Sequence, residues 1–324
     1  MDIDDTIIEV EGYLKQGASF GYSGVRGLNA VLAVASTNDC APVILTQRLR
    51  KGSTSSARGA KRIVSDALAQ LRRMPGDRRV LLRADAAYYS HAVVLAAQQA
   101  GADVSVTVRM NPSIRRAIES IPDAAWTPIA YPGATRDVET GRLISRAEIP
   151  YTAFTSKKGQ QISGRLVVRR IPELGPTASR EHPTLFDTWR FHAFFTTVTP
   201  DELDTVTIDQ THRHHAIIEQ INADLKASAL AHLPSGKYAA NAAWLVLAVI
   251  AHNLTRAAAV IADPAEKLGR AVTQTIRRTL INVPARIARS ARKLRLHLPE
   301  CWPWAREWAA LLTRSTSPPG ITVS

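Results

Sequence analysis

Asp4, Asp85 and Glu219 are the side chains of this sequence best suited to metal-assisted phosphate chemistry. Asp4 lies in a strand expected over residues 3–11, Asp85 ends a strand expected over residues 79–84, and Glu219 lies on an expected helix. Carboxylates this far apart in sequence meet only if the fold brings two strands and a helix together. Mg²⁺ prefers a few carboxylates and leaves coordination positions for water and substrate oxygens. Two such ions about 4 Å apart can support an in-line displacement at phosphorus without covalent attachment of a side chain.

The positive charge of the chain favours a polyanionic partner. Its 324 residues include 41 Lys and Arg against 28 Asp and Glu, which gives a formal net charge of +13. Residues 48–79 hold ten basic residues against Asp66 and Asp77, and residues 267–299 hold nine with no acidic residue. One such run is usually a solvated surface, and enzymes of small metabolites rarely need this field. Two runs together with the three carboxylates favour nucleic acid, because each phosphate contact releases counterions.

The composition is that of a globular protein of a reducing compartment. Apolar residues make up 45% of the chain, enough for a sizeable core. Cys40 and Cys301, the two cysteines, are expected to be inert buried thiols, and no secretory signal pattern opens the sequence. The apolar stretch at residues 242–251 is shorter than the roughly 20 residues of a membrane span. We therefore expect a buried core helix, a cytoplasmic protein and no membrane partner.

The elements that position the carboxylates follow from hydrophobic periodicity and turn signals. Strands over residues 3–11, 28–35 and 42–49 suggest an antiparallel meander, followed by a helix over residues 57–74. A strand at 79–84, a helix at 89–100 and a strand at 104–108 predict a parallel crossover. The fold class is therefore α/β, with a mixed sheet flanked by helices.

The middle of the chain differs, because alternating strand patterns dominate residues 110–205. We interpret this segment as a β-rich insertion that precedes the helix carrying Glu219. That helix is expected over residues 211–232, and a second one begins near Tyr238. The predicted organisation has four parts: a first part of the catalytic core at 1–109, the insertion at 110–205, the rest of the core at 206–262, and a basic C-terminal region at 263–324.

A helix over residues 211–232 would place four side chains along one stripe, namely His212, His215, Glu219 and Lys226. Such a stripe offers a carboxylate for a metal ion and a cation for a neighbouring phosphate. A solvent-exposed Glu and Lys on an amphipathic helix is the competing interpretation, and the stripe alone does not decide between them.

Taken together, these motifs resemble the DDE transposases of bacterial insertion sequences. The closest branch has a Tyr–Arg–Glu–Lys signature and is typified by insertion sequence 1380. That family has an Asp-x-Asp-x-Thr strand, an Asp after Leu-x-Arg-x, and a Glu seven residues before a Lys. The matching positions here are Asp4 with Thr6, Arg83 with Asp85, and Glu219 with Lys226. Weaker landmarks lie at residues 50–54, 239–254, 283–286 and 298–304, so the resemblance covers roughly residues 1–315.

The resemblance implies a ribonuclease-H-like catalytic domain with its β-strand insertion between the second Asp and the Glu. It implies that Asp4, Asp85 and Glu219 are catalytic and hold two Mg²⁺ ions, which Mn²⁺ could replace. The activity would be nicking at transposon ends, followed by attack of the free 3′-hydroxyl on target DNA. A Trp of the insertion stacks on a flipped base in related enzymes, a role that Trp126 could take unless it is simply a buried Trp. The expected partners are the terminal inverted repeats, target DNA and a second copy of the chain, near the bacterial nucleoid.

The sequence departs from the family pattern in two ways. The signature Tyr is replaced by His212 and the signature Arg by His215, with Arg213 two residues out of register. A protonated His can bind phosphate, so this contact would depend on pH. The chain also starts almost at the first catalytic strand, where family members usually carry an end-recognition region, so we expect a truncated copy. The expected DNA contacts are Lys226, His212, His215, Arg213, Arg50, Lys51 and Arg83.

Three alternatives remain open from the sequence. Residues 2–6 also resemble the motif of haloacid-dehalogenase-type phosphatases, although the apolar residues Ile7, Ile8 and Val10 follow the aspartates instead of preceding them. His212, His215 and Glu219 could form a zinc hydrolase site, which would leave the aspartates and the charge unexplained. A DNA-binding remnant without catalysis is the third.

Overall fold

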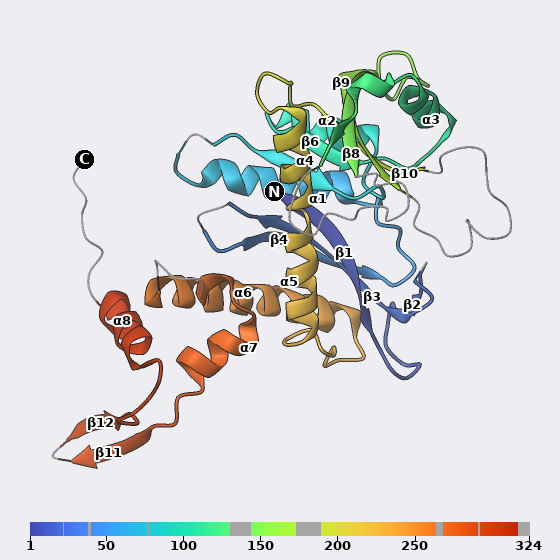
Figure 1. Cartoon of the computed structure of the whole chain (residues 1–324). Helices are drawn as coiled ribbons and strands as arrows, with labels where there is room; N and C mark the ends of the chain where they lie inside the picture. Colours follow the sequence, from blue (N-terminus) through green and yellow to red (C-terminus); the bar gives the residue numbers. More distant parts are fainter. Residues whose placement is uncertain are drawn as a thin grey trace, which may run out of the picture. The chain divides into compact units, whose positions relative to one another are not determined.

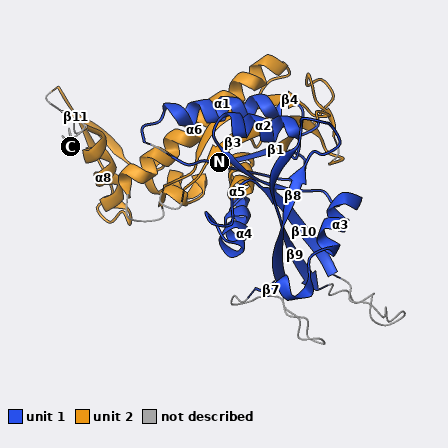
Figure 2. Cartoon of the chain, turned by 90° about the horizontal axis from the view of Figure 1, so that it is seen from above, with its two compact units in different colours: residues 1–4, 55–216 blue, residues 5–54, 217–324 orange. Residues whose placement is uncertain are grey.

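The computed structural model describes residues 1–21, 23–37, 40–76, 78–129, 144–172, 189–263, 268–290 and 292–316. The chain forms two compact units, shown in different colours in Figure 2. Unit 1 comprises Met1–Asp4 and Ser55–Ala216, and unit 2 comprises Asp5–Thr54 and Ile217–Ser324. The chain crosses between them within strand β1 (Asp2–Glu9), before helix α1, and in the first turn of helix α5.

Unit 1 contains a mixed sheet with helices (Figure 1). Its further elements are α1 (Ala60–Arg73), β5 (Leu81–Ala84), α2 (His91–Gln99), β6 (Asp103–Thr107), α3 (Pro112–Glu119), β7 (Thr127–Pro128), β8 (Ser145–Ala153), β9 (Ile162–Pro172), β10 (Trp189–Thr196) and α4 (Thr205–Arg213). The strand order within this unit is β1-β5-β6-β10-β9-β8-β7. The first three strands are parallel, and the remaining ones are joined by antiparallel pairing.

The parallel crossover predicted from the sequence is confirmed, since β5, α2 and β6 follow one another and the two strands pair in parallel. The β-rich segment does not form a separate sheet, because β10 pairs with β6 through Phe194 opposite Thr107. An apolar cluster of Val167, Phe194, Val198 and Ile208 packs α4 against these strands. The observed class is α/β with a large mixed sheet and flanking helices, as expected from the sequence.

Local signals explain where two helices of unit 1 begin. The Asn111 side chain accepts a hydrogen bond from the Ile114 N–H, and Pro112 takes the first helical position of α3. Asp204 likewise accepts from the Thr207 N–H at 2.7 Å and so caps α4. Caps of this type satisfy N–H groups that have no partner inside the helix.

The single helix expected over residues 211–232 is wrong, because α4 ends at Arg213 and α5 (Ala216–Lys226) begins after a turn. The Thr211 carbonyl accepts from both the Arg83 guanidinium and the His214 N–H. The His215 N–H turns to the His212 carbonyl instead, which closes a tighter turn. His212 and Glu219 therefore lie on different helices, and the predicted four-residue stripe does not exist.

Unit 2 contains the rest of β1 and, among its described residues, further strands and helices. They are β2 (Ser19–Phe20), β3 (Arg26–Ala35), β4 (Val43–Lys51), α5, α6 (Tyr238–Ala262), α7 (Thr273–Ile276) with the π-helical segment Arg277–Ile281, β11 (Arg286–Ser290), β12 (Lys293–His297) and α8 (Ala305–Thr316). β3 and β4 form a long antiparallel ladder, and β1 and β2 also neighbour β3. This arrangement agrees with the predicted meander.

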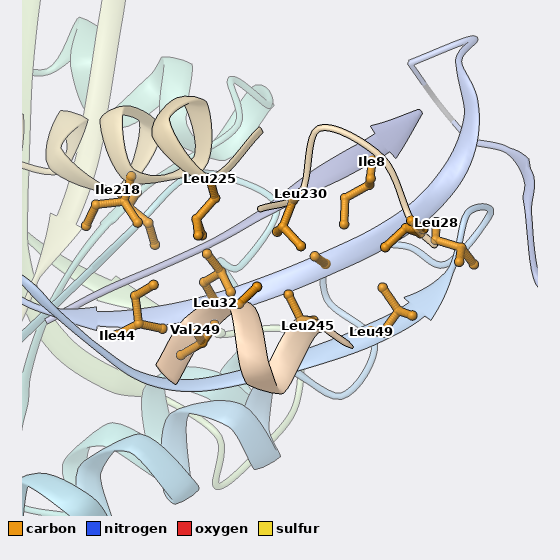
Figure 3. Close-up of a cluster of buried hydrophobic side chains, with 14 of the residues drawn as sticks. Ile8, Leu28, Leu32, Ile44, Leu49, Ile218, Leu225, Leu230, Leu245 and Val249 are labelled. Atoms are coloured by element: carbon orange, nitrogen blue, oxygen red, sulfur yellow. The ribbon is translucent and has the colours of Figure 1, made fainter. Parts of the chain in front are cut away.

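The core of unit 2 lies between these strands and the helices α5 and α6 (Figure 3). Leu28, Leu32 and Ile44 from the strands meet Ile218 and Leu225 from α5. Leu245 and Val249 from α6 complete the cluster, which buries the apolar stripe of each helix.

Helix α6 combines a packed face with an exposed apolar face. Asn253 binds both backbone groups of Ile44, at 3.0 and 2.8 Å, and so fastens α6 to β4. Asn241, His252 and Arg256 are buried on the packed side. By length and composition alone, α6 would be long and apolar enough to cross a membrane. Its buried polar residues and its core contacts are those of a helix packed within a protein.

Candidate active site and DNA interface

Strands β1 and β5 carry the two predicted catalytic aspartates of unit 1, with Asp4 within β1 and Asp85 directly after β5. Their parallel register pairs Asp2 with Arg83 and Ile3 with Ala84, so its continuation by one residue would set Asp4 alongside Asp85. Neighbouring strands lie about 4.8 Å apart, and side chains in register point to the same face. β5 ends at Ala84, so Asp85 stands at the carboxyl end of a strand, where sites of α/β sheets concentrate. Asp4 is half-buried and Asp85 is exposed.

Asp2 is fully buried and fixes this register. It accepts two hydrogen bonds from Arg83, at 2.9 and 2.7 Å, and its Oδ1 lies 2.9 Å from His215 Nδ1. Burial opposes ionisation of the Asp2 carboxyl. The bonds from His215 and Arg83 and the charge of the Met1 ammonium nevertheless hold its pKa below the usual value. The resulting network ties β1, β5 and the residue that precedes α5 together.

Arg50 and Arg83, both expected to contact DNA, are instead held inside the protein. Arg83 is 6% exposed and is occupied by Asp2 and the Thr211 carbonyl. In unit 2, Arg50 is equally buried, with an ion pair to Asp5 at 3.1 Å and a hydrogen bond to Asn29 at 2.8 Å. Their positions argue against phosphate contact. Lys51, the neighbour of Arg50, is exposed.

The two histidines at the signature positions have structural partners. The His212 ring stacks on Phe194 with centroids 4.1 Å apart. Its Nδ1 lies 2.8 Å from the Ser105 hydroxyl and its Nε2 lies 3.1 Å from the Thr107 hydroxyl. Burial lowers the pKa of His212 to about 3, so the ring is neutral at physiological pH. A neutral, enclosed ring does not suit the predicted phosphate contact, and His215 is engaged by Asp2. Arg213 is exposed.

Glu219 and Lys226 lie on α5, where both side chains are exposed. Glu219 is in the first turn and Lys226 in the last, and a spacing of seven residues places them on one face. Glu219 belongs to unit 2 whereas Asp4 and Asp85 belong to unit 1, so the meeting of all three stays a prediction. In the part of the chain that the structure describes, no three His, Cys, Asp or Glu side chains gather closely enough to hold a metal ion.

Trp126 lies at a cavity of about 580 Å³ in unit 1. The Arg170 guanidinium lies between Trp126 and Trp189, 4.5 and 4.7 Å from their ring centroids. Phe191 stands 6.2 Å from Trp126, and Arg115 adds a second cation to the lining. Trp126 is half-buried, and the pocket offers indole surface beside the arginines and beside Glu119 and Asp123, the latter paired with Arg170 at 3.4 Å.

Three residues near the predicted sites were not identified from the sequence. They are Asp2, whose carboxylate holds the register of β1 with β5, and Arg170 and Trp189, which line the cavity at Trp126. Asp2 had a signal, because it lies two residues before Asp4 and therefore on the same face of the strand. The partnership of Arg170 with two Trp rings depends on cross-strand register between β9 and β10, for which the sequence gives no direct signal.

Comparison with known proteins places the chain in a family. The profile of the family described as "Transposase DDE domain group 1" matches residues 1–317. No curated protein sequence matches the chain. Among solved structures, a piggyBac transposase in a synaptic complex with hairpin DNA has a TM-score of 0.43 and 8% identity. That match covers 99% of this chain and 54% of the other, so the chain spans about half the length of that transposase. Because the family profile covers nearly all of its residues, the chain belongs to the DDE transposase family, group 1.

Proposed function

We propose that this chain is the catalytic core of an insertion-sequence transposase that nicks DNA at the element's ends and joins them to target DNA. In the first step, water attacks phosphorus and the bond to the 3′-oxygen breaks, which leaves a 3′-hydroxyl and a 5′-phosphate. In the second step, that 3′-hydroxyl attacks a target phosphodiester and displaces a target 3′-oxygen. One phosphorus–oxygen bond forms as another breaks in each step.

The observation that supports the proposal is the parallel register of β1 and β5, which would bring Asp4 and Asp85 together if continued by one residue, in a chain of the DDE family. Asp4 on β1 is half-buried and Asp85 after β5 is exposed, and two such carboxylates would be a donor set that suits Mg²⁺ or Mn²⁺. Glu219 would complete the set from α5. When bound, such ions would polarise the phosphate and favour the attacking oxygen.

The neighbouring residues have distinct roles in this proposal. Asp2, Arg83 and His215 hold the strand that carries Asp4, and they act by positioning. The exposed cations Lys51, Arg213 and Lys226 are the proposed phosphate contacts. Arg50, Arg83 and His212 are not among them, because each is occupied inside the protein.

The aromatic cavity around Trp126 is proposed to receive an unstacked base. Base stacking on an indole is sequence-tolerant, and guanidinium groups can bind the adjacent phosphate. Arg170 covers one side of the Trp126 ring, so a base would take the other side or displace Arg170.

The proposed partners follow from this activity. They are terminal inverted repeats, target DNA and a second copy of the chain in a synaptic complex, in the bacterial cytoplasm near the nucleoid. Membership of the insertion sequence 1380 branch remains a prediction.

A nicking assay on supercoiled DNA tests the function directly. Wild type is expected to nick DNA in Mg²⁺. The nicking rate of Asp85→Ala is expected to fall by more than about 100-fold, because even residues that only support metal ligands contribute 10- to 100-fold to activity or metal affinity. The matched control is Asp66→Ala, which removes a surface carboxylate of the same unit.

Thermal unfolding of the three proteins would confirm that loss of nicking is not loss of folding. Equal nicking by wild type and Asp85→Ala would remove these carboxylates from the mechanism. DNA binding by a wild type that never nicks would point to a non-catalytic DNA-binding protein.

A further inference from the structure

The hairpin of β11 and β12 in unit 2 has two chemically different faces. Its register pairs Arg286 with His297 and Ala288 with Arg295. Directly opposed residues of an antiparallel pair point to the same face, and alternate residues along a strand do so too. The resulting cationic face carries Arg286, Lys293, Arg295 and His297. The other face, which we call the apolar face, carries Ile287, Arg289, Leu294 and Leu296.

The side chains of the cationic face are open to solvent. Every residue of β12 is exposed, and so is Arg286 on β11. Figure 1 shows the hairpin extending beyond α7 and α8, between which it is inserted in the chain. Among the residues that the structure describes, no Asp or Glu forms an ion pair with a side chain of the cationic face.

The link between the two strands adds a further cation. Arg292 has a φ of 64°, in the left-handed region that favours Gly or Asn in tight hairpins. Arginine is not a residue type that this backbone conformation favours, but it places a positive charge at the tip of the hairpin. Conformation and charge therefore compete at Arg292, and the sequence retains charge.

The other basic run of the chain behaves differently, and this contrast identifies the hairpin as the exposed charge. In that run Arg50 pairs with Asp5, Arg62 with Asp66, and Arg79 with both Asp103 and Glu202. Internal carboxylates thus neutralise several of its cations. Residues 267–299 contain no acidic residue of their own, and in the described part of the chain no ion pair joins a basic side chain of the hairpin to an Asp or Glu, so this charge is available to an external anion.

We propose that the cationic face of the β11–β12 hairpin is a second, non-catalytic binding surface for duplex DNA. This proposal rests on the proposed function in one respect, namely that DNA is chosen as the polyanion that the cationic face binds. Strands rise about 3.4 Å per residue, so β11 spans about four base pairs of duplex. A two-stranded ribbon also fits the major groove. Lys and Arg side chains bind phosphates without reading sequence, so the contact is expected to be sequence-independent and strongly dependent on salt.

The matched pair Arg295→Gln and Arg289→Gln tests this assignment, because both remove one guanidinium from the same hairpin but from opposite faces. Fluorescence anisotropy with the full-length chain and a random-sequence duplex, without divalent metal, gives affinity over a range of NaCl concentrations. Arg295→Gln is expected to reduce the slope of log affinity against log salt by about one, and Arg289→Gln to leave it unchanged. The triple variant Arg286→Gln, Lys293→Gln, Arg295→Gln is expected to reduce the slope by about three.

Equal slopes for the Arg295→Gln and Arg289→Gln variants would overturn the proposal. A second result would also overturn it. If the wild type binds phosphatidylserine vesicles, and Arg295→Gln weakens this vesicle binding but leaves DNA binding intact, the cationic face is assigned to a membrane. Failure here leaves the proposed function untouched if Asp85→Ala still abolishes nicking. Conversely, if Arg295→Gln reduces the salt slope and Asp85→Ala nicks as fast as wild type, the hairpin proposal is supported and the catalytic proposal is refuted.

Discussion

Each unit of the protein contains a buried Asp–Arg–His network. In unit 1, Asp2 binds Arg83 and His215. In unit 2, Asp224 binds the Arg256 guanidinium at 2.6 Å and lies 3.6 Å from His252 Nε2. The same three residue types therefore form a network in both units, but the two networks join different helices and strands.

The two networks differ in what they hold. The Asp2 network joins two strands of a sheet to the residue before α5, two positions away from Asp4. The Asp224 network joins α5, α6 and α7, because Asp224 also accepts the Thr273 N–H and hydroxyl at 2.8 and 2.6 Å. Burial raises the pKa of Asp224, but its bonds with His252 and Thr273 lower the net value to about 2.

The comparison indicates how α5, which carries Glu219, is held. His215 precedes the first residue of the helix and is bound within unit 1, whereas Asp224 lies near its last turn and is bound within unit 2. One network stands beside a proposed catalytic residue and the other supports helix packing. We therefore expect the Asp2 network to affect nicking and stability, and the Asp224 network to affect mainly stability.

The largest effect on stability is expected for Asp224→Ala. Removing this carboxylate leaves the Arg256 charge buried and the Thr273 N–H without an acceptor. Breaking one side of a buried ion pair costs about 3–5 kcal/mol, which denaturant unfolding would measure. The control Asp66→Ala breaks the exposed pair with Arg62 and is expected to cost less than about 1 kcal/mol. Similar costs for the two variants would show that the Asp224 network does not stabilise the fold.

Asp2→Asn is expected to lower stability by about 2–3 kcal/mol, since hydrogen bonds to charged groups contribute about that much. Nicking by the folded variant is expected to fall about 10-fold or more and to need more Mg²⁺, because Asp4 is positioned by the strand that Asp2 holds. Assays well below the unfolding temperature, over a Mg²⁺ titration, separate the two effects. A destabilised variant with wild-type rate and Mg²⁺ dependence would reduce Asp2 to a purely structural role.

The sequence predicts the local elements well and the long-range pairings poorly. Short apolar runs bounded by turn residues were sufficient to predict β3, β4 and the crossover from β5 to β6, and the spacing of motifs singled out Asp4 and Asp85. The break between α4 and α5 depends on a hydrogen bond from Arg83 to Thr211, 128 residues away. No local pattern encodes such a bond.

The same limit applies to the residues of the site. Arg50 belongs to a basic run but is buried, because cross-strand register sets it against Asn29 and Asp5. The β11–β12 hairpin was missed for the opposite reason. Its alternation is local, but basic residues occupy most of one face and Arg289 interrupts the other, so the segment resembles a charged tail.

The last expected effect, which is absent at neutral pH, is the pH dependence that His212 contributes in unit 1. The pKa of this ring is about 3 in the folded protein and 6.5 for an ordinary His. Above pH 6.5 both folded and unfolded chains are neutral at this position, so the His212 ring contributes no pH dependence of stability there. Below pH 6.5 the His212 ring becomes protonated in the unfolded chain, whereas in the folded protein it stays neutral down to about pH 3. The free energy of unfolding therefore falls by up to about 1.4 kcal/mol per pH unit in that window.

His212→Gln removes the titrating ring and is expected to flatten this slope between pH 6.5 and about pH 4.5, whatever its cost at neutral pH. Asp2 does not account for a slope in this range, because its pKa lies below 3.8 and its contribution is lost only in stronger acid. The matched control His214→Gln removes an exposed ring from the end of the same helix. If His212→Gln and His214→Gln keep the same slope as wild type, the His212 ring is protonated in the folded protein, and the phosphate contact predicted for it from the sequence becomes tenable again.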